Sequence, residues 1–129
     1  MSHSVNIATQ FKDIQLLEKT FHSLGWKTTR TTTCRTYPTD PSRNIVHDYV
    51  AVNPKSSGFD VGIDLDSDSN AVFTCDFYDS SIAESLGKNL QHVKQGYALS
   101  KLKNFMHEED LDYSIETLPT GQLKVIATK

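Results

Sequence analysis

The chain has 129 residues, of which 37% are hydrophobic and 22% are charged, and its formal net charge is −3. This is the length of one domain, and a chain of this size buries about two-thirds of its unfolded surface, so it needs no disulfide or metal to fold. The composition excludes a membrane span and a low-complexity disordered chain, and the slight acidic excess argues against a general nucleic-acid binder. We expect a single globular domain over residues 1–129.

The cysteines and the N-terminal residues indicate the compartment. Cys34 and Cys75 lie far apart and form no CxxC pair, so the sequence encodes neither a zinc ribbon nor a redox dithiol. The N-terminus has neither the basic run nor the apolar run of a signal peptide. We expect reduced cysteines, no metal or other cofactor, no membrane contact and a cytoplasmic location.

The first 25 residues predict a strand, a helix and a helix stop. Apolar and polar residues alternate over residues 5–11, which is typical of a strand. Asp13 is placed to cap a helix, whose apolar residues recur at helical spacing as far as Leu24. Gly25 can adopt the left-handed conformation that ends a helix.

The middle of the chain predicts four strands. Residues 26–35 are rich in Thr, Lys and Arg and favour a strand with a polar face, which the prolines in the loop 37–42 end. Residues 45–52 predict a strand inside a sheet, followed by a turn at 53–58. Two further strands, around residues 61–65 and 71–77, are expected to form a hairpin.

The last third predicts a long helix and a second hairpin. Ser81 and Glu84 have the spacing of a capping box, and apolar steps of three and four continue the helix to about His107. Residues 111–117 and 123–127 alternate on either side of a Pro-Thr-Gly turn. The order β-α-β-β-β-β-α-β-β predicts an α+β fold, an antiparallel sheet with two helices packed on one face.

Four aspartates on the first hairpin form a candidate carboxylate cluster. Asp60, Asp64 and Asp66 share one strand parity, and Asp76 is expected opposite them. Such a cluster could hold Mg²⁺ or support acid–base chemistry, although no nucleophile or phosphate-binding loop accompanies it and a solvated hairpin face is the favoured interpretation. The run 64–70 begins like a calcium loop but lacks the required Gly and Glu, so we expect a polar hairpin tip.

Basic residues and histidines offer weaker signals. The basic residues of the first third could steer a charged partner, or could pair with the acidic hairpin; they are Lys27, Arg30, Arg35 and Arg43. The five histidines show no metal-ligand spacing. His47 and Asp48 are adjacent in a predicted strand, so we expect them to point to opposite faces and form no dyad.

The segment Gly58-Phe59-Asp60-Val61-Gly62 predicts a specific ion pair. Phe59 and Val61 are expected to face the core, which turns Asp60 to the other face, where Gly62 leaves a recess. Arg35 is the expected occupant of this recess, because its guanidinium can pair with a carboxylate through two hydrogen bonds. A pair that pins the sheet is favoured over a binding site.

Several short motifs occur in order along nearly the whole chain. They are Met1-Ser2-His3, Thr9 with Asp13, Leu24-Gly25-Trp26, Cys34-Arg35-Thr36-Tyr37, Gly58-Phe59-Asp60-Val61-Gly62, Asp76-Phe77-Tyr78, and Gln95-Gly96-Tyr97-Ala98 with Lys101. Together they resemble the hypothetical chloroplast reading-frame 35 family, also called domain of unknown function 1257, as a divergent member. The resemblance implies a cyanobacterial, plastid or cyanophage source, and it brings no reaction, cofactor or catalytic residue.

The absence of a catalytic constellation favours a non-enzymatic protein-binding or adaptor module with an unidentified protein partner. The resemblance implies an accessory role beside an AAA+ ATPase, or in host metabolism if the chain is viral, and a location in the plastid stroma or host cytoplasm in those cases. Two alternatives stay open: a metal-assisted enzyme using the aspartates, and a weak nucleic-acid binder using residues 27–35. The candidate binding or structural polar cluster is Arg35, Tyr37, Asp60, Asp64 and Asp76.

Overall fold

The computed structural model describes residues 4–30, 34–36 and 46–128. Two compact units make up the chain, a first unit from Met1 to Tyr97 and a second unit from Ala98 to Lys129. The single globular domain expected from the length stays a prediction. Among the described residues, no helix combines the length and the apolar character needed to cross a bilayer.

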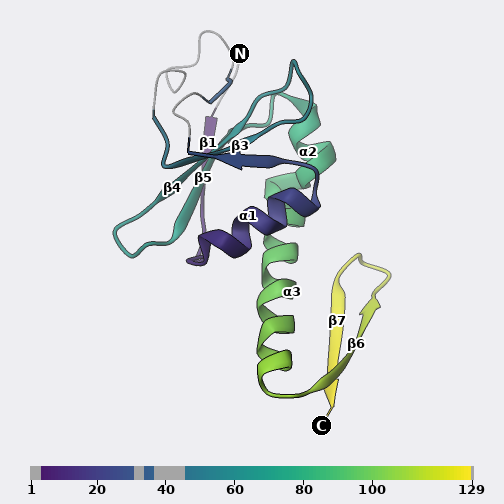
Figure 1. Cartoon of the computed structure of the whole chain (residues 1–129). Helices are drawn as coiled ribbons and strands as arrows, with labels where there is room; N and C mark the ends of the chain where they lie inside the picture. Colours follow the sequence, from purple (N-terminus) through teal and green to yellow (C-terminus); the bar gives the residue numbers. More distant parts are fainter. Residues whose placement is uncertain (1–3, 31–33, 37–45, 129) are drawn as a thin grey trace. The chain divides into compact units, whose positions relative to one another are not determined.

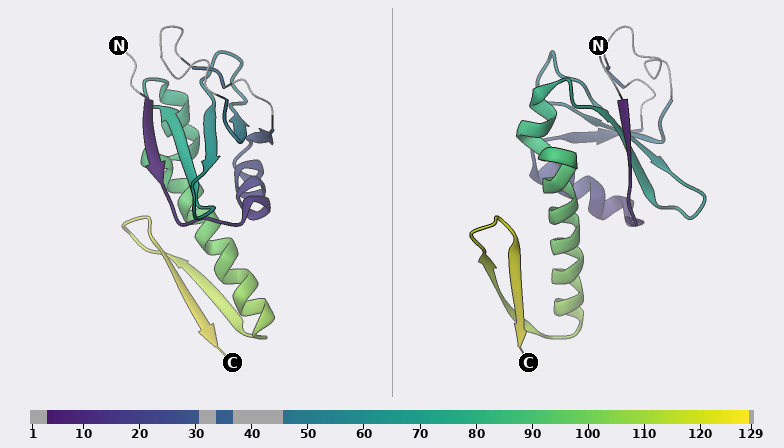
Figure 2. Two further views of the ribbon diagram at one scale, coloured as in Figure 1. Left: turned by 90° about the vertical axis from the view of Figure 1, so that its left-hand side faces the viewer. Right: turned by 180° about the vertical axis from the view of Figure 1, so that it is seen from behind.

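The first unit is a five-stranded antiparallel sheet with helices on one face (Figures 1 and 2). The strands lie in the order β1-β5-β4-β3-β2, and each neighbouring pair is antiparallel. Their bounds are β1 Ser4–Ala8, β2 Lys27–Thr29, β3 Tyr49–Val52, β4 Val61–Leu65 and β5 Ala71–Asp76. The predicted α+β fold is confirmed.

Helix α1 (Ile14–Ser23) begins and ends at the predicted residues. The Asp13 carboxylate accepts a hydrogen bond from the Leu16 N–H at 3.1 Å. At the other end Gly25 has φ +86°, and the Trp26 N–H donates to the Phe21 carbonyl at 2.9 Å. This helix end buries Trp26 completely, and the indole N–H donates to the Ser85 hydroxyl at 2.7 Å.

The predicted long second helix is broken at Gly87. Helix α2 (Ser80–Leu86) ends there, a 3-10 turn η2 (Lys88–Leu90) follows, and helix α3 runs over Gln91–Glu108. Gly87 has φ 86° and ψ 161°, a conformation open to glycine alone among common residues.

The predicted capping box at Ser81 and Glu84 is also wrong. Asp79 caps α2 instead, because its Oδ1 accepts a hydrogen bond from the Ser81 N–H at 2.9 Å. An aspartate two residues before Ser81 reaches the first free amides of this helix, so the helix begins earlier than the sequence pattern indicates.

The core of the first unit lies between the sheet and the helices. The apolar stripe predicted for one continuous helix is buried despite the break at Gly87, and it packs with residues of α1 and of the three central strands. Its members are Ile82, Leu86, Leu90, Val93 and Tyr97, all at most 3% exposed. The break therefore redirects the backbone without removing any member of the stripe from the core.

Two predicted strands are shorter than the sequence pattern indicates. Of the strand expected over 26–35, the described residues form only β2, and Cys34–Thr36 lie outside the strands, with the Arg35 backbone bonded to Asp60. Of the strand expected over 45–52, the described residues form β3 alone, and the exposed Val46 precedes it. The loop expected at 37–42, with Tyr37, lies outside the described residues, as does Arg43.

The second unit contains the end of α3 and a hairpin of β6 (Asp112–Thr117) and β7 (Leu123–Thr128). Both strands were predicted. They pair only with each other among the described strands, in a separate two-stranded sheet. The turn closes through the Gly121 N–H, which donates to the Leu118 carbonyl at 2.9 Å, and Gly121 has φ +86°.

Replacement of Gly87 by Ala should lower the free energy of unfolding more than Gly25→Ala. Both positions have φ +86°, which strains any side-chain-bearing residue by about 1–2 kcal/mol, and the ψ of 161° at Gly87 adds to this strain. A Cβ at Gly87 would also lie 3.0 Å from His92, whereas nothing lies within 4 Å of one at Gly25. Urea denaturation of the two variants measures the difference, and equal losses would contradict a steric role for His92.

Candidate functional site

Arg35 and Asp60 form the predicted ion pair, and Asp60 directly precedes β4. The Arg35 Nη2 donates to Asp60 Oδ1 at 2.8 Å and Nε donates to Oδ2 at 3.0 Å. The Arg35 backbone N–H also donates to Oδ2 at 2.9 Å, and the Asp60 N–H donates back to the Arg35 carbonyl at 2.9 Å. Asp60 is 3% exposed, so this carboxylate is fully enclosed by donors. The hydrogen bond to Asp60 raises the pKa of Arg35.

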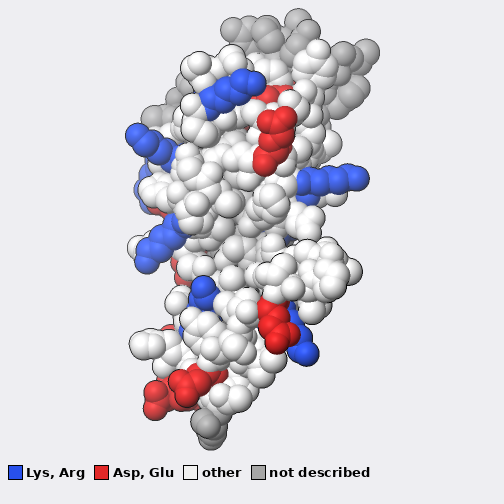
Figure 3. Space-filling view, turned by 90° about the vertical axis from the view of Figure 1, so that its right-hand side faces the viewer, with Lys and Arg blue, Asp and Glu red and all other residues white. Residues whose placement is uncertain are grey.

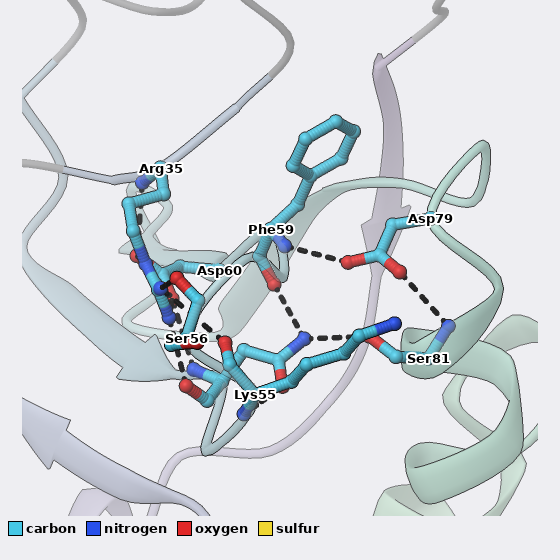
Figure 4. Close-up of polar contacts among 8 residues, drawn as sticks. Arg35, Lys55, Ser56, Phe59, Asp60, Asp79 and Ser81 are labelled. Carbon is cyan, nitrogen blue, oxygen red and sulfur yellow. Dashed lines mark hydrogen bonds and ion pairs between the residues drawn. The ribbon is translucent and has the colours of Figure 1, made fainter.

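The rest of the Arg35 guanidinium holds the turn between β3 and β4 (Figure 4). Nη1 donates to the Ser56 carbonyl at 2.6 Å, and Nη2 donates to the Asn53 carbonyl at 2.7 Å. Asn53 in turn donates its backbone N–H to Asp60 Oδ1 at 2.9 Å. The turn is thus closed around one cation, and the donors of Arg35 are consumed by backbone carbonyls and Asp60.

A second layer ties the same turn to helix α2 (Figure 4). The Asn53 amide donates to the Phe59 carbonyl at 3.0 Å and to the Ser81 hydroxyl at 2.9 Å. The Phe59 N–H donates to Asp79 Oδ2 at 2.6 Å. Burial alone would raise the pKa of Asp79, but hydrogen bonds from the Phe59 N–H and from the Ser81 hydroxyl and N–H lower it below its usual value. A Cβ on Gly58 would collide with the Asn53 amide, so only glycine fits this turn.

The recess left by Gly62 is occupied by His47, so the prediction that Arg35 fills it is wrong. A Cβ on Gly62 would lie 2.5 Å from the His47 ring. The ring is 3% exposed, and its Nδ1 lies 2.7 Å from Asp64 Oδ2. Arg35 instead reaches Asp60 from beside the turn between β3 and β4, and the His47 imidazole covers β4 at Gly62.

The strand expected to turn His47 and Asp48 to opposite faces does not include them: both residues lie before β3, and both bond to Asp64. The Asp48 N–H donates to Asp64 Oδ1 at 2.9 Å, and the Asp48 carboxylate accepts the Leu65 N–H at 2.8 Å. The pairing of His47 with Asp64 was missed by the sequence reasoning. The feature of the sequence that indicates this pairing is Gly62, because the absence of a side chain there makes room for the ring of His47, which lies before β3.

The remaining aspartates do not join a common site. Asp66 lies at the β4–β5 hairpin tip, where its carboxylate accepts the Asp68 and Asn70 N–H groups at 2.9 Å, as the polar-tip prediction requires. Asp76 is 2% exposed, and its Oδ2 has no hydrogen-bond partner. Within residues 4–30, 34–36 and 46–128, no group of three His, Cys, Asp or Glu is placed to hold a metal ion.

The basic strand is likewise divided. Lys27 is exposed on the edge strand β2, and Arg30 lies over the Tyr49 ring, 5.2 Å from its centroid, with Nη2 donating to the hydroxyl at 3.2 Å. Arg35 is committed to Asp60. The described residues of the predicted basic surface therefore do not form one phosphate-binding row.

The two cysteines are unpaired and buried. Burial raises the pKa of both thiols from 9.0 to about 12, with a further rise at Cys34 from Asp60 and at Cys75 from Asp76. Both thiols are therefore protonated at neutral pH, and a thiolate nucleophile has no basis at either position.

Exposed apolar side chains in the second unit are a feature that the sequence reasoning did not single out. All six residues of β6 are exposed. The exposed large side chains of this unit are Leu102, Phe105, Tyr113, Ile115 and Ile126. Alternation over residues 111–127 gave the strands correctly but could not show that they leave the main sheet.

No family model, curated protein or solved structure matches the chain.

The Asp60→Asn variant should lose about 1–3 kcal/mol of unfolding free energy, because an amide nitrogen then faces donors that require a charged acceptor. Asp68→Asn is the matched control, since Asp68 is exposed at the β4–β5 tip and should change stability by no more than about 0.5 kcal/mol. Urea denaturation of both variants measures the effect. Equal stability of Asp60→Asn and the wild type would remove the structural role of the pair.

Alkaline pH should weaken the fold through the cysteines. Unfolded thiols ionise near pH 9.0 while the folded ones keep their protons to about 12, so their contribution is complete below pH 9 and lost as the pH rises through this window. As the pH rises through this window, the free energy of unfolding should fall less steeply for Cys34→Ala and for Cys75→Ala than for the wild type. The difference in slope should be up to about 1.4 kcal/mol per pH unit for each variant. Parallel stability curves for wild type and variants between pH 8 and 10, measured in urea, would contradict this assignment.

Proposed function

We propose that this chain is a non-enzymatic protein-binding module, an adaptor in a larger cytoplasmic assembly, and that the second unit carries the binding surface. The observation that supports this proposal is the hairpin β6–β7, a two-stranded sheet with exposed apolar side chains. A lone hairpin is marginally stable in water, and exposed apolar patches mark interaction surfaces.

One face of the hairpin is predominantly apolar. Tyr113, Ile115 and Thr117 share this face of β6, and the register places Ala127, Val125 and Leu123 directly across from them. Tyr113 is 44% exposed and Ile115 is 37% exposed. A partner that covers this face would bury apolar area at both strands.

The end of α3 adds to the apolar character of the second unit. Leu102 and Phe105 are three residues apart and therefore lie on neighbouring positions of the helix surface. Their exposed fractions are 39% and 53%. Aromatic side chains are common anchors of protein interfaces.

The polar residues of the first unit give less support to a metal-assisted enzyme or to a nucleic-acid binder. Asp60 is bonded to Arg35 and Asp64 to His47, so neither carboxylate is free to begin a metal site.

The resemblance to the chloroplast reading-frame 35 family adds the AAA+ ATPase assembly as a part of this proposal, because genes of its bacterial members lie beside such ATPases.

The experiment compares two double variants, each of which replaces two exposed apolar residues by threonine. In the double variant Tyr113→Thr and Ile115→Thr, threonine keeps the strand propensity of β6 but removes the apolar anchors. The matched control is Val5→Thr with Val46→Thr, which changes two exposed apolar residues of the first unit. Each protein is used to capture partners from a lysate of the source organism, and the captured proteins are quantified by mass spectrometry.

We expect the wild type and the control to enrich the same partner and the hairpin variant to lose it, with circular dichroism unchanged. Enrichment of the same partner by all three proteins would contradict the location of the binding surface. Enrichment of no protein by any of them would contradict the function.

A further inference from the structure

We propose that β6 is the docking edge of the hairpin and that it pairs, as a third strand, with an extended segment of a partner protein whose side chains alternate between apolar and basic. This inference rests on the proposed function and specifies the partner's chemistry. It follows from three properties of the second unit: an open strand edge, two chemically different faces, and a one-sided charge.

The outer edge of β6 is open. Among the described strands β6 pairs only with β7, in a register from Asp112↔Thr128 to Thr117↔Leu123. In an antiparallel pair, every second residue of an edge strand directs its N–H and C=O away from its neighbour. Natural edge strands are commonly blocked by proline or lysine, and β6 contains neither.

β6 is a better edge than β7. All six residues of β6 are exposed, whereas Leu123 and Val125 of β7 are half-buried. An added strand therefore meets less obstruction along β6.

The two faces of β6 differ in chemistry. Tyr113, Ile115 and Thr117 point to one face, and Asp112, Ser114 and Glu116 point to the other. A strand added in register places its side chains on the same two faces alternately. Apolar side chains of the added strand would meet the first face, and basic side chains would meet Asp112 and Glu116 on the second.

The charged residues around β6 are predominantly acidic. From residue 104 to residue 123 the chain has five acidic residues and no lysine or arginine. The acidic residues are Glu108, Glu109, Asp110, Asp112 and Glu116. Figure 3 shows acidic side chains beside uncharged ones at the lower end of the displayed face. Lys124 lies across from Glu116 in the register, while Asp112 faces the uncharged Thr128, so the second face keeps a net negative charge.

In the register centred on Ser114, the same charges disfavour a second copy of this chain as the added strand. An antiparallel copy centred on Ser114 would place Asp112 opposite the copy's Glu116 at both ends of the pairing. Like charges directly opposite each other destabilise a strand pair. A basic segment of a different protein avoids this repulsion and gains attraction at the same positions.

The test uses an eight-residue fluorescent peptide of alternating valine and lysine, titrated with the full chain at low salt and followed by anisotropy. We expect saturable binding, and a weakening of about tenfold when glutamate replaces lysine. Two further peptides carry N-methyl groups on every second residue, in one frame or the other. Strand addition predicts that one frame, the one facing β6, loses about tenfold or more in affinity.

Protein variants test the same contact from the other side. The double variant Asp112→Asn with Glu116→Gln should bind the lysine peptide about three- to tenfold more weakly. The control Asp68→Asn with Glu84→Gln removes the same charge from exposed positions of the first unit and should bind as the wild type does. The peptide series needs no variant, so it decides the matter even if a substitution disturbs the hairpin.

Equal loss in both N-methyl frames, or in neither, would overturn strand addition. Equal binding by the charge variant and its control would overturn the acidic recognition. A dimer in sedimentation that the peptide does not dissociate would assign the edge to a second copy and overturn the proposal. If the lysine peptide fails to bind while lysate capture still depends on Tyr113 and Ile115, the docking mode is wrong and the protein-binding function stands.

Discussion

The first unit depends on the charge of one buried carboxylate. Asp60 is 3% exposed, and an unpaired ion at that depth would cost several kcal/mol. Arg35 and the Asn53 backbone supply its donors, and the remaining Arg35 donors hold the turn between β3 and β4. That turn positions Phe59 against Asp79, and Asp79 begins helix α2. The charge of Asp60 therefore connects a loop, a turn, two strands and a helix end.

This arrangement gives a structural role to residue types that are common in active sites. Arg35, Asp60, His47 and Asp64 each bond to a partner from another segment, and each pair holds together parts of the chain far apart in sequence. The second unit has the opposite character, because its hairpin leaves both polar and apolar groups without an internal partner strand. Polar side chains of the first unit are thus bonded within the fold, whereas the second unit exposes apolar side chains of α3, β6 and β7.

Local chemistry determined which features could be predicted. Asp13 and Gly25 act within a few residues of their own positions. The Arg35–Asp60 pair was expected from the parity of Phe59 and Val61 and from the recess at Gly62; the pairing is confirmed, but His47 fills the recess. The break at Gly87 could not be predicted, because the apolar stripe continues through it. The His47–Asp64 pair needs the cross-strand position of Gly62, which depends on register rather than on sequence spacing.

Trp26 is the sole tryptophan of the chain, and it is fully buried in the first unit with its indole bonded to Ser85. Its fluorescence therefore reports on the sheet and helices packed around it. A melting curve followed at this indole measures the unfolding of the first unit. Loss of β6 and β7 has to be observed through their own amides, for example by hydrogen exchange.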